Sequence, residues 1–203
     1  TIKMLTGLLT PTKGSIIVDG LIPSKKRIEN NKKIGAVFGQ KTQLWWDLPV
    51  IESFKLIKKM YDIPEKEYRK NLMEFTELLE LDELLEKQVK NLSLGQKIRC
   101  EIAATFLHNP KIVYLDEPTI GLDVLVKEKI REFIKEINRK NKTTVILTTH
   151  DVKDIEEVCN RIILIDQGKV MYDGSKQSFK DKYGKTTFAE IIVKDKKIKL
   201  IYN

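Results

Sequence analysis

Ile112-Val113-Tyr114-Leu115-Asp116-Glu117-Pro118-Thr119 is the stretch that decides the fold of this 203-residue chain. An apolar run that ends in two acids is typical of a buried parallel strand followed by a polar turn. Because open α/β sheets bind ligands at the carboxyl ends of their strands, both acids are candidates for chemistry. We expect Asp116 to hold Mg²⁺, directly or through water, and Glu117 to act on an attacking water. A strand that simply ends in a polar turn fits the same residues.

Strand and helix patterns alternate on both sides of this stretch. Ile2, Leu5, Leu8 and Leu9 share one face of an expected first helix, whereas residues 50–108 show helical periodicity only. The other expected elements are strands over 15–18, 34–38 and 143–149, helices over 124–140 and 152–159, and hairpins over 161–172 and 186–203. This alternation predicts an α/β fold with a mostly parallel sheet and an inserted helical subdomain.

Three further signals lie at the ends of predicted elements. Ser93 is a good N-cap residue, and with Gly95 it opens a helix whose first amides could bind an anion; an ordinary capped helix explains it as well. His150 follows the strand over 143–149 and is expected at the same sheet edge as the two acids. His108, at a helix end before Pro110, is expected to be structural.

Two more candidate positions lie next to the ends of predicted elements. Gly121-Leu122-Asp123 precedes the helix over 124–140, where the glycine and the acid fit an ordinary N-terminal cap. Gln40 lies just beyond the strand over 34–38.

Composition narrows the function class. The net charge is +8, but only six of the 37 basic residues are arginine, and the lysines are spread along the chain. Nucleic-acid sites favour clustered arginine, so no nucleic-acid partner is expected, although attraction to an anionic membrane surface is compatible with the charge. No apolar run approaches the ~20 residues of a membrane span. Two cysteines cannot form a disulfide framework, which indicates a reducing compartment.

Taken together in order and spacing, these motifs resemble the nucleotide-binding domain of ATP-binding cassette (ABC) transporters, a P-loop NTPase-like cassette. Leu92–Gln96 resembles the signature, Tyr114–Thr119 the Walker B strand, and Gly121–Asp123 the D-loop. Gln40 resembles the Q-loop glutamine and His150 the switch histidine.

The resemblance implies a division of the chain into four parts. They are 1–49, a partial ATPase core with the Q-loop at Gln40; 50–108, a helical subdomain that ends in the signature helix; 109–185, the ATPase core with Walker B, D-loop and H-loop; and 186–203, the start of a C-terminal accessory region.

The resemblance also implies ATP and Mg²⁺ as cofactors and assigns roles to the motif residues. Glu117 would be the general base, His150 would hold the γ-phosphate and the water, and Asp116 and Gln40 would serve the Mg²⁺ shell. Ser93, Gly95 and Gln96 would reach the γ-phosphate bound by a partner chain, and Asp123 would couple across the dimer.

The family's architecture implies the partners and the location. A second ATP-binding subunit, expected to be identical, would form a head-to-tail dimer with this one. A membrane permease would dock on the Gln40–Trp46 region, where Trp45 and Trp46 are candidate anchors, although one of them could instead pack inward. The chain would then be cytoplasmic and peripheral on the inner face of the cell membrane.

Departures from the family pattern refine this reading. Leu94 stands where many members have glycine, and Gly39 is an extra residue before Gln40. With Trp45-Trp46-Asp47 these features resemble an exporter-type subgroup linked to drug or antibiotic efflux.

The phosphate loop, G-x-x-x-x-G-K-[ST], appears nowhere in the 203 residues. The chain begins with Thr1, and its first helix resembles the helix that follows the phosphate loop in the family. We therefore expect a fragment that lacks the phosphate loop and everything before it, and that has no ATPase activity by itself. Two alternatives stay open: a soluble ABC-type ATPase that acts on the ribosome or DNA, and a catalytically dead remnant.

Overall fold

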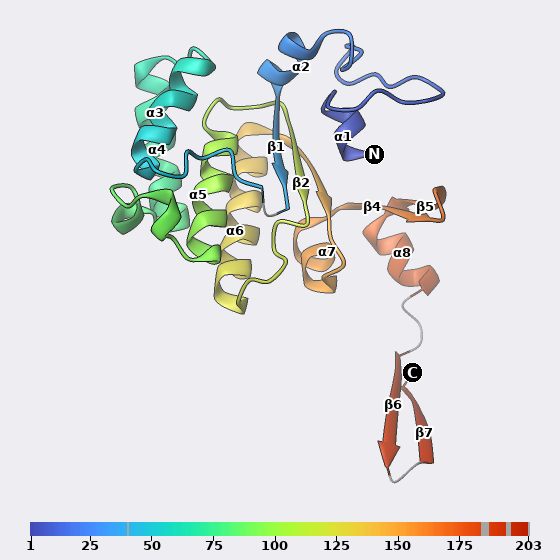
Figure 1. Cartoon of the computed structure of the whole chain (residues 1–203). Helices are drawn as coiled ribbons and strands as arrows, with labels where there is room; N and C mark the ends of the chain where they lie inside the picture. Colours follow the sequence, from blue (N-terminus) through green and yellow to red (C-terminus); the bar gives the residue numbers. More distant parts are fainter. Residues whose placement is uncertain (40, 184–186, 194–195, 203) are drawn as a thin grey trace. The chain divides into compact units, whose positions relative to one another are not determined.

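The computed structural model describes residues 1–39, 41–183, 187–193 and 196–202, the last two ranges by their backbone alone. The chain divides into two compact units, Thr1–His150 and Asp151–Asn203. The first unit contains α1 (Ile2–Leu5), α2 (Arg27–Lys33), β1 (Ile34–Phe38), α3 (Val50–Met60), α4 (Glu65–Leu79), the 3₁₀ helices η1 (Asp82–Leu84) and η2 (Val89–Asn91), α5 (Leu94–Phe106), β2 (Ile112–Asp116), α6 (Val124–Asn141) and β3 (Thr144–Thr148) (Figure 1). The second contains α7 (Val152–Val158), β4 (Arg161–Asp166), β5 (Lys169–Ser175), α8 (Lys176–Tyr183), β6 (Thr187–Val193) and β7 (Lys196–Tyr202).

The sheet of the first unit has the strand order β1-β2-β3, and both neighbouring pairs are parallel. Asp116 is in register with Phe38 on one side and with Thr148 on the other, so the three carboxyl ends form one edge. The predicted α/β fold with parallel strands is confirmed. The register decides which side chains meet at the edge.

One face of the sheet is covered by α5 and α6 (Figure 1). Gly35 on β1 makes this packing tight, because a Cβ atom there would lie 2.7 Å from Thr105 Cγ2 and 2.8 Å from the Thr105 carbonyl oxygen. Any larger residue at this position would push α5 away from the strand. The opposite face carries a cluster of four buried residues: Ile2, Val18, Ile34 and Tyr114.

Three phenylalanines join the helical stretch to the rest of the unit. Phe133 of α6 meets Phe75 of α4 at 5.3 Å and Phe106 of α5 at 5.2 Å between ring centroids, both edge to face. Edge-to-face pairs of this kind add about 0.5–1.5 kcal/mol each beyond the area they bury. Residues 50–108 contain helices and no strand, as their periodicity predicts. The boundaries of the four predicted parts stay predictions.

Two expectations for the first 20 residues are wrong. Helix α1 ends at Leu5, and Leu8 and Leu9 are about half exposed instead of continuing its buried face. Gly7 adopts a φ of +76°, where its missing Cβ lets the chain approach the Pro23 carbonyl, and the helix cannot continue through that conformation. Residues 15–18 form no strand; only Val18 makes an isolated antiparallel bridge, with Leu21.

The second unit carries both predicted hairpins, β4–β5 and β6–β7, each antiparallel. The ring of Tyr172 on β5 packs with the rings of Phe179 and Tyr183 on α8.

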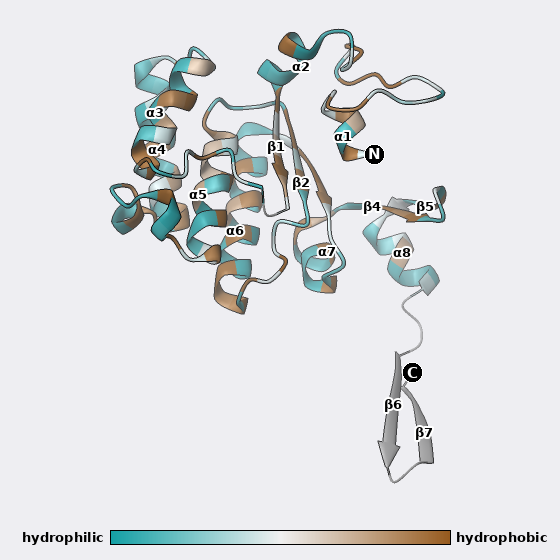
Figure 2. Cartoon of the chain, viewed as in Figure 1, coloured by the Kyte–Doolittle hydropathy of each residue, from teal (hydrophilic) through white to brown (hydrophobic). Residues whose placement is uncertain are grey.

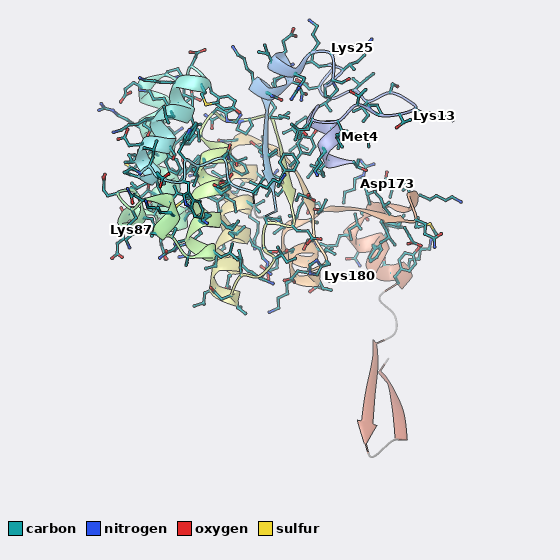
Figure 3. All side chains as sticks on the ribbon, viewed as in Figure 1. Met4, Lys13, Lys25, Lys87, Asp173 and Lys180 are labelled. Atoms are coloured by element: carbon teal, nitrogen blue, oxygen red, sulfur yellow. The ribbon has the colours of Figure 1, made fainter. Side chains whose placement is uncertain are left out.

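Apolar residues run along β1 and β2, and polar residues cover much of the helices (Figure 2). Lys13, Lys25 and Lys87 project outward from the ribbon, in keeping with the dispersed lysines of the sequence (Figure 3). No helix in the described part of the chain is both long and apolar enough to cross a membrane.

Candidate functional site

The candidate site lies at the carboxyl edge of the sheet, where backbone hydrogen bonds continue past the strand ends. Gly39 N donates to the Asp116 carbonyl over 3.0 Å, and Glu117 N donates to the Thr148 carbonyl over 3.1 Å. The loops after β1, β2 and β3 therefore leave the sheet side by side. This places Asp116, Glu117 and His150 at one edge, as their positions after predicted strands indicated.

Thr148 orients the acid pair. Its hydroxyl donates to Asp116 Oδ1 over 2.7 Å and lies 3.1 Å from Glu117 N, which donates to it. One hydroxyl thus fixes the rotamer of the first acid and the backbone of the second. Sequence reasoning assigned no role to Thr148. The available signal was its place as the last residue of a β-branched run, at the same edge as Asp116.

Glu117 has a φ of +50°, in the left-handed region that non-glycine residues seldom occupy. Such backbone conformations are concentrated at functional sites. The side chain turns toward His150, whose Nδ1 lies 3.6 Å from Glu117 Oε1. Both side chains are accessible, at 43% exposure for Glu117 and 72% for His150, so a ligand could reach them.

Gln40 lies outside the described residues. Its described neighbours show where the chain leaves and rejoins the edge: Gly39 bonds to Asp116 as above, and Lys41 N donates to the Phe38 carbonyl over 3.0 Å.

The predicted signature begins α5 with a complete capping box. Ser93 Oγ accepts from Gln96 N over 3.3 Å, and Gln96 Oε1 accepts from Ser93 N over 2.9 Å. The expected N-cap role of Ser93 is confirmed. This arrangement satisfies two of the donors at the start of the helix and holds Ser93, Gly95 and Gln96 in one rigid turn.

The predicted D-loop lies against that turn. A Cβ atom on Gly121 would be 3.5 Å from the Leu94 side chain, and one on Gly95 would be 3.3 Å from Val126. Asp123 caps α6, because its Oδ1 accepts from Val126 N over 2.9 Å. The signature and the D-loop thus form a second group, built on the starts of α5 and α6.

The donor set at the sheet edge fits Mg²⁺. Mg²⁺ is usually held by one or two carboxylates, several waters and substrate phosphates, not by a full cage of protein ligands. Asp116, oriented by Thr148, and the adjacent Glu117 offer such carboxylates. Within the described ranges no group of three or more His, Cys, Asp or Glu side chains could hold a metal ion. Asp116, whose orientation is fixed by Thr148, fits the role of a carboxylate that would hold Mg²⁺.

His108 is structural, as expected. Its ring stacks on Tyr61 at 3.9 Å between centroids, and its Nε2 is 3.0 Å from the Ile34 carbonyl oxygen. Burial lowers the pKa of His108 to about 4, so the ring is neutral at physiological pH.

Trp45 and Trp46 are 39% and 52% exposed, so neither is packed in the core. Lys97 of α5 lies over the Trp46 ring at 4.3 Å from its centroid. Nearby, Lys90 N donates to the Trp46 carbonyl and Lys90 Nζ pairs with Asp47. The two indoles form an exposed aromatic patch on a well-anchored segment.

Comparison with known proteins identifies the family. A family model described as ABC transporter matches residues 1–120. Among curated proteins, the ABC transporter ATP-binding protein NatA of Bacillus subtilis is 29% identical over 87% of this chain and 72% of its own length. The linearmycin resistance ATP-binding protein LnrL of the same organism is 33% identical over 95% of this chain and 61% of its own. The methionine import ATP-binding protein MetN of Carboxydothermus hydrogenoformans is 33% identical over 85% of this chain and 52% of its own. The chain thus spans about half to three quarters of these relatives.

Solved structures agree with this assignment. CbiO1 of Clostridium perfringens, part of an ABC transporter complex, superimposes with a TM-score of 0.75 at 29% identity, covering 89% of this chain and 74% of that one. A dimeric ATP-binding cassette in a post-hydrolysis state, bound to ADP and Pi, superimposes with a TM-score of 0.74 at 30% identity, covering 86% and 78%. The chain belongs to the ABC transporter family and has the fold of its ATP-binding cassettes.

Proposed function

We propose that the chain is part of the ATP-binding and ATP-hydrolysing subunit that energises a membrane ABC exporter. The observation that carries the proposal is the aligned sheet edge, where Thr148 orients Asp116 and the Glu117 carboxylate turns toward His150. This is the positioned set of charged groups on which phosphoryl transfer depends.

The roles are those that the family resemblance implies, and the contacts at the sheet edge support them. Glu117 accepts the proton of the attacking water, and His150, beside its carboxylate, holds that water and the γ-phosphate. Asp116, together with Gln40, would hold Mg²⁺. When bound, the metal neutralises the charge that develops on the transferred phosphoryl group.

The signature and D-loop act on a second nucleotide. Ser93, Gly95 and Gln96 present the start of α5 to the γ-phosphate bound by a second, identical subunit, and Asp123 couples the two subunits. The rigid capping box supports this role, because a preorganised turn loses little freedom when it meets a phosphate.

The aromatic patch is the docking site of the permease. Trp45 and Trp46 are exposed on an anchored segment, and large aromatic side chains are enriched among residues that dominate interface energies. This docking places the subunit on the cytoplasmic face of the cell membrane. Export is supported by the similarity to the linearmycin resistance protein over 95% of the chain.

Substitution of Glu117 tests the catalytic assignment. In the full-length protein, Glu117→Gln should abolish steady-state ATP hydrolysis and leave ATP binding intact. Glu132→Gln, the same change on the exposed side of α6, is the matched control and should leave hydrolysis unchanged. Hydrolysis near the wild-type rate in Glu117→Gln would contradict the role given to this residue.

The direction of transport needs a separate test in cells. A strain that carries Glu117→Gln should become more sensitive to at least one antibiotic of a broad panel, and wild type supplied in trans should restore resistance. Unchanged sensitivity together with impaired uptake of a nutrient would overturn export.

The 203 residues by themselves should bind ATP weakly and not hydrolyse it, because they contain no phosphate loop to surround the β- and γ-phosphates with amides. Micromolar affinity in a nucleotide titration of this chain would refute this.

A further inference from the structure

Glu101 is a carboxylate in the middle of the signature helix α5 with 2% exposure. Removing a carboxylate from water is costly unless hydrogen bonds replace its hydration. Burial raises the pKa of Glu101, and the hydrogen bonds that it accepts oppose this rise. The hydrogen-bond donors around this side chain therefore indicate its structural role.

The donors to Glu101 come from one short segment directly after Gln40. Thr42 Oγ1 donates to Oε2 over 2.6 Å, and Gln43 N donates to both carboxylate oxygens, over 2.9 Å to Oε1 and 3.2 Å to Oε2. The Thr42 hydroxyl in turn accepts from Leu44 N over 3.0 Å. One buried side chain on α5 thus organises three consecutive residues of the loop.

Neighbouring contacts join the same segment to the helices. Gln43 Nε2 donates to Thr105 Oγ1, one turn further along α5, over 2.7 Å. Trp45 N donates to the buried Ser53 Oγ of α3 over 3.1 Å. Only Glu101 among these partners presents two acceptor oxygens to the loop, and it receives both the Thr42 hydroxyl and the Gln43 amide.

The helix transmits this attachment to the signature. Glu101 lies eight residues after Ser93 on α5, which corresponds to about 12 Å along a continuous helix. The segment after Gln40 and the turn that contains Ser93 are therefore both attached to helix α5. Gly35 lets α5 pack directly on β1, the strand that leads into the loop.

We propose that Glu101 is a positioning residue whose buried carboxylate fastens the segment after Gln40 to α5, so that the Q-loop and the signature move as one body. Thr42 and Gln43 are its partners in the loop. The catalytic consequence rests on the proposed ATPase function, whereas the attachment itself does not. Glu101 acts through Gln40 and touches no nucleotide.

Two substitutions in the full-length protein test the attachment. Glu101→Gln keeps the shape but turns an acceptor oxygen into an NH₂ donor, so at least one of the loop's donors loses its partner. Cys100→Ala removes part of the neighbouring fully buried side chain on the same helix and serves as the control for lost packing. The measurement is hydrogen–deuterium exchange of the amides of residues 42–45.

The expected result is that Glu101→Gln accelerates exchange in this segment about tenfold or more, as loss of a charge-assisted hydrogen bond implies, while Cys100→Ala does not. Unchanged exchange of residues 42–45 in Glu101→Gln would overturn the inference. This readout needs no ATP turnover, so it also separates failure of the inference from failure of the proposed function.

ATPase kinetics test the consequence. Glu101→Gln should lower kcat about tenfold and leave KM for ATP within about twofold, because positioning affects the transition state more than ground-state binding. Thr42→Val should lower kcat in the same way, Thr42→Ser should restore it, and the double variant Glu101→Gln/Thr42→Val should be no worse than the poorer single one. Additive losses of kcat in the double variant would refute the coupling. A wild-type kcat in Glu101→Gln, although residues 42–45 exchange faster, would also refute it.

Discussion

The Thr148 hydroxyl donates to Asp116 Oδ1 across 2.7 Å between two neighbouring parallel strands, at residues 32 positions apart in the chain. Since the same oxygen accepts from Glu117 N, a single side chain holds both acids of the proposed site in place. This contact explains how an accessible acid pair keeps a defined geometry at the end of the sheet. It also yields the first prediction.

Thr148→Val in the full-length protein should lower kcat for ATP hydrolysis about tenfold, the typical effect of losing one hydrogen bond of about 1.4 kcal/mol. The change keeps the branched shape, so the strand should remain folded. Thr148→Ser keeps the hydroxyl and should stay near the wild-type rate. A normal kcat in Thr148→Val, measured beside Thr144→Val at the opposite end of β3 as control, would show that Thr148 does not orient the acids.

Ser93 separates the capping role from the proposed phosphate role. Ser93→Ala should lower the free energy of unfolding by about 1 kcal/mol, whereas Ser93→Gly should lower it by only a few tenths of a kcal/mol. If Ser93 also contacts a phosphate in the dimer, both variants should lose most of their ATPase activity. Denaturant unfolding and steady-state kinetics on the two variants check this. If ATPase activity instead falls only in proportion to the loss of stability in each variant, Ser93 acts only as the N-cap of α5.

His108 should make the protein less stable in mild acid. Its pKa is 6.5 when unfolded and about 4 in the fold, so between these values the unfolded state binds the extra proton. Its contribution to stability is therefore complete above pH 6.5 and falls by roughly 1.4 kcal/mol per pH unit as the pH drops toward 4.

His108→Phe keeps the ring beside Tyr61 and removes the titration. Denaturant unfolding at pH 7 and pH 5 should show a smaller loss of stability in this variant than in wild type. Equal losses in the two proteins would assign the acid sensitivity to other groups.

The free side of β3 should make the 203-residue chain prone to self-association. In the described residues β3 pairs with β2 alone, and Ile146 at its centre is 37% exposed. An unpaired strand edge is a template for pairing with another chain. Light scattering of this chain by itself should reveal aggregation that Ile146→Lys reduces. A monodisperse wild-type sample with a cooperative melt would count against this.

Local sequence patterns were sufficient for the elements that hold the site. The run from Ile112 to Asp116 is a strand in register with two others, and Ser93 caps α5, because strand and helix periodicity and N-capping depend on residues close together in the chain. The same locality explains why the prediction of a buried helix face through Leu8 and Leu9 is wrong: the close approach of Gly7 to Pro23, which accompanies the end of α1, is a contact between residues far apart in the chain.

The sequence by itself thus determined the α/β class, the order of the motifs and their place at strand ends and helix starts. Only the tertiary structure decided that Thr148 orients Asp116 and that Glu101 receives Thr42 and Gln43, contacts that span 32 residues in one case and 58 or 59 in the other. Periodicity shows that a residue lies in a strand or a helix. It does not show which polar partner fills the space beside it, because that partner is set by sheet register and by the close packing of α5 on β1.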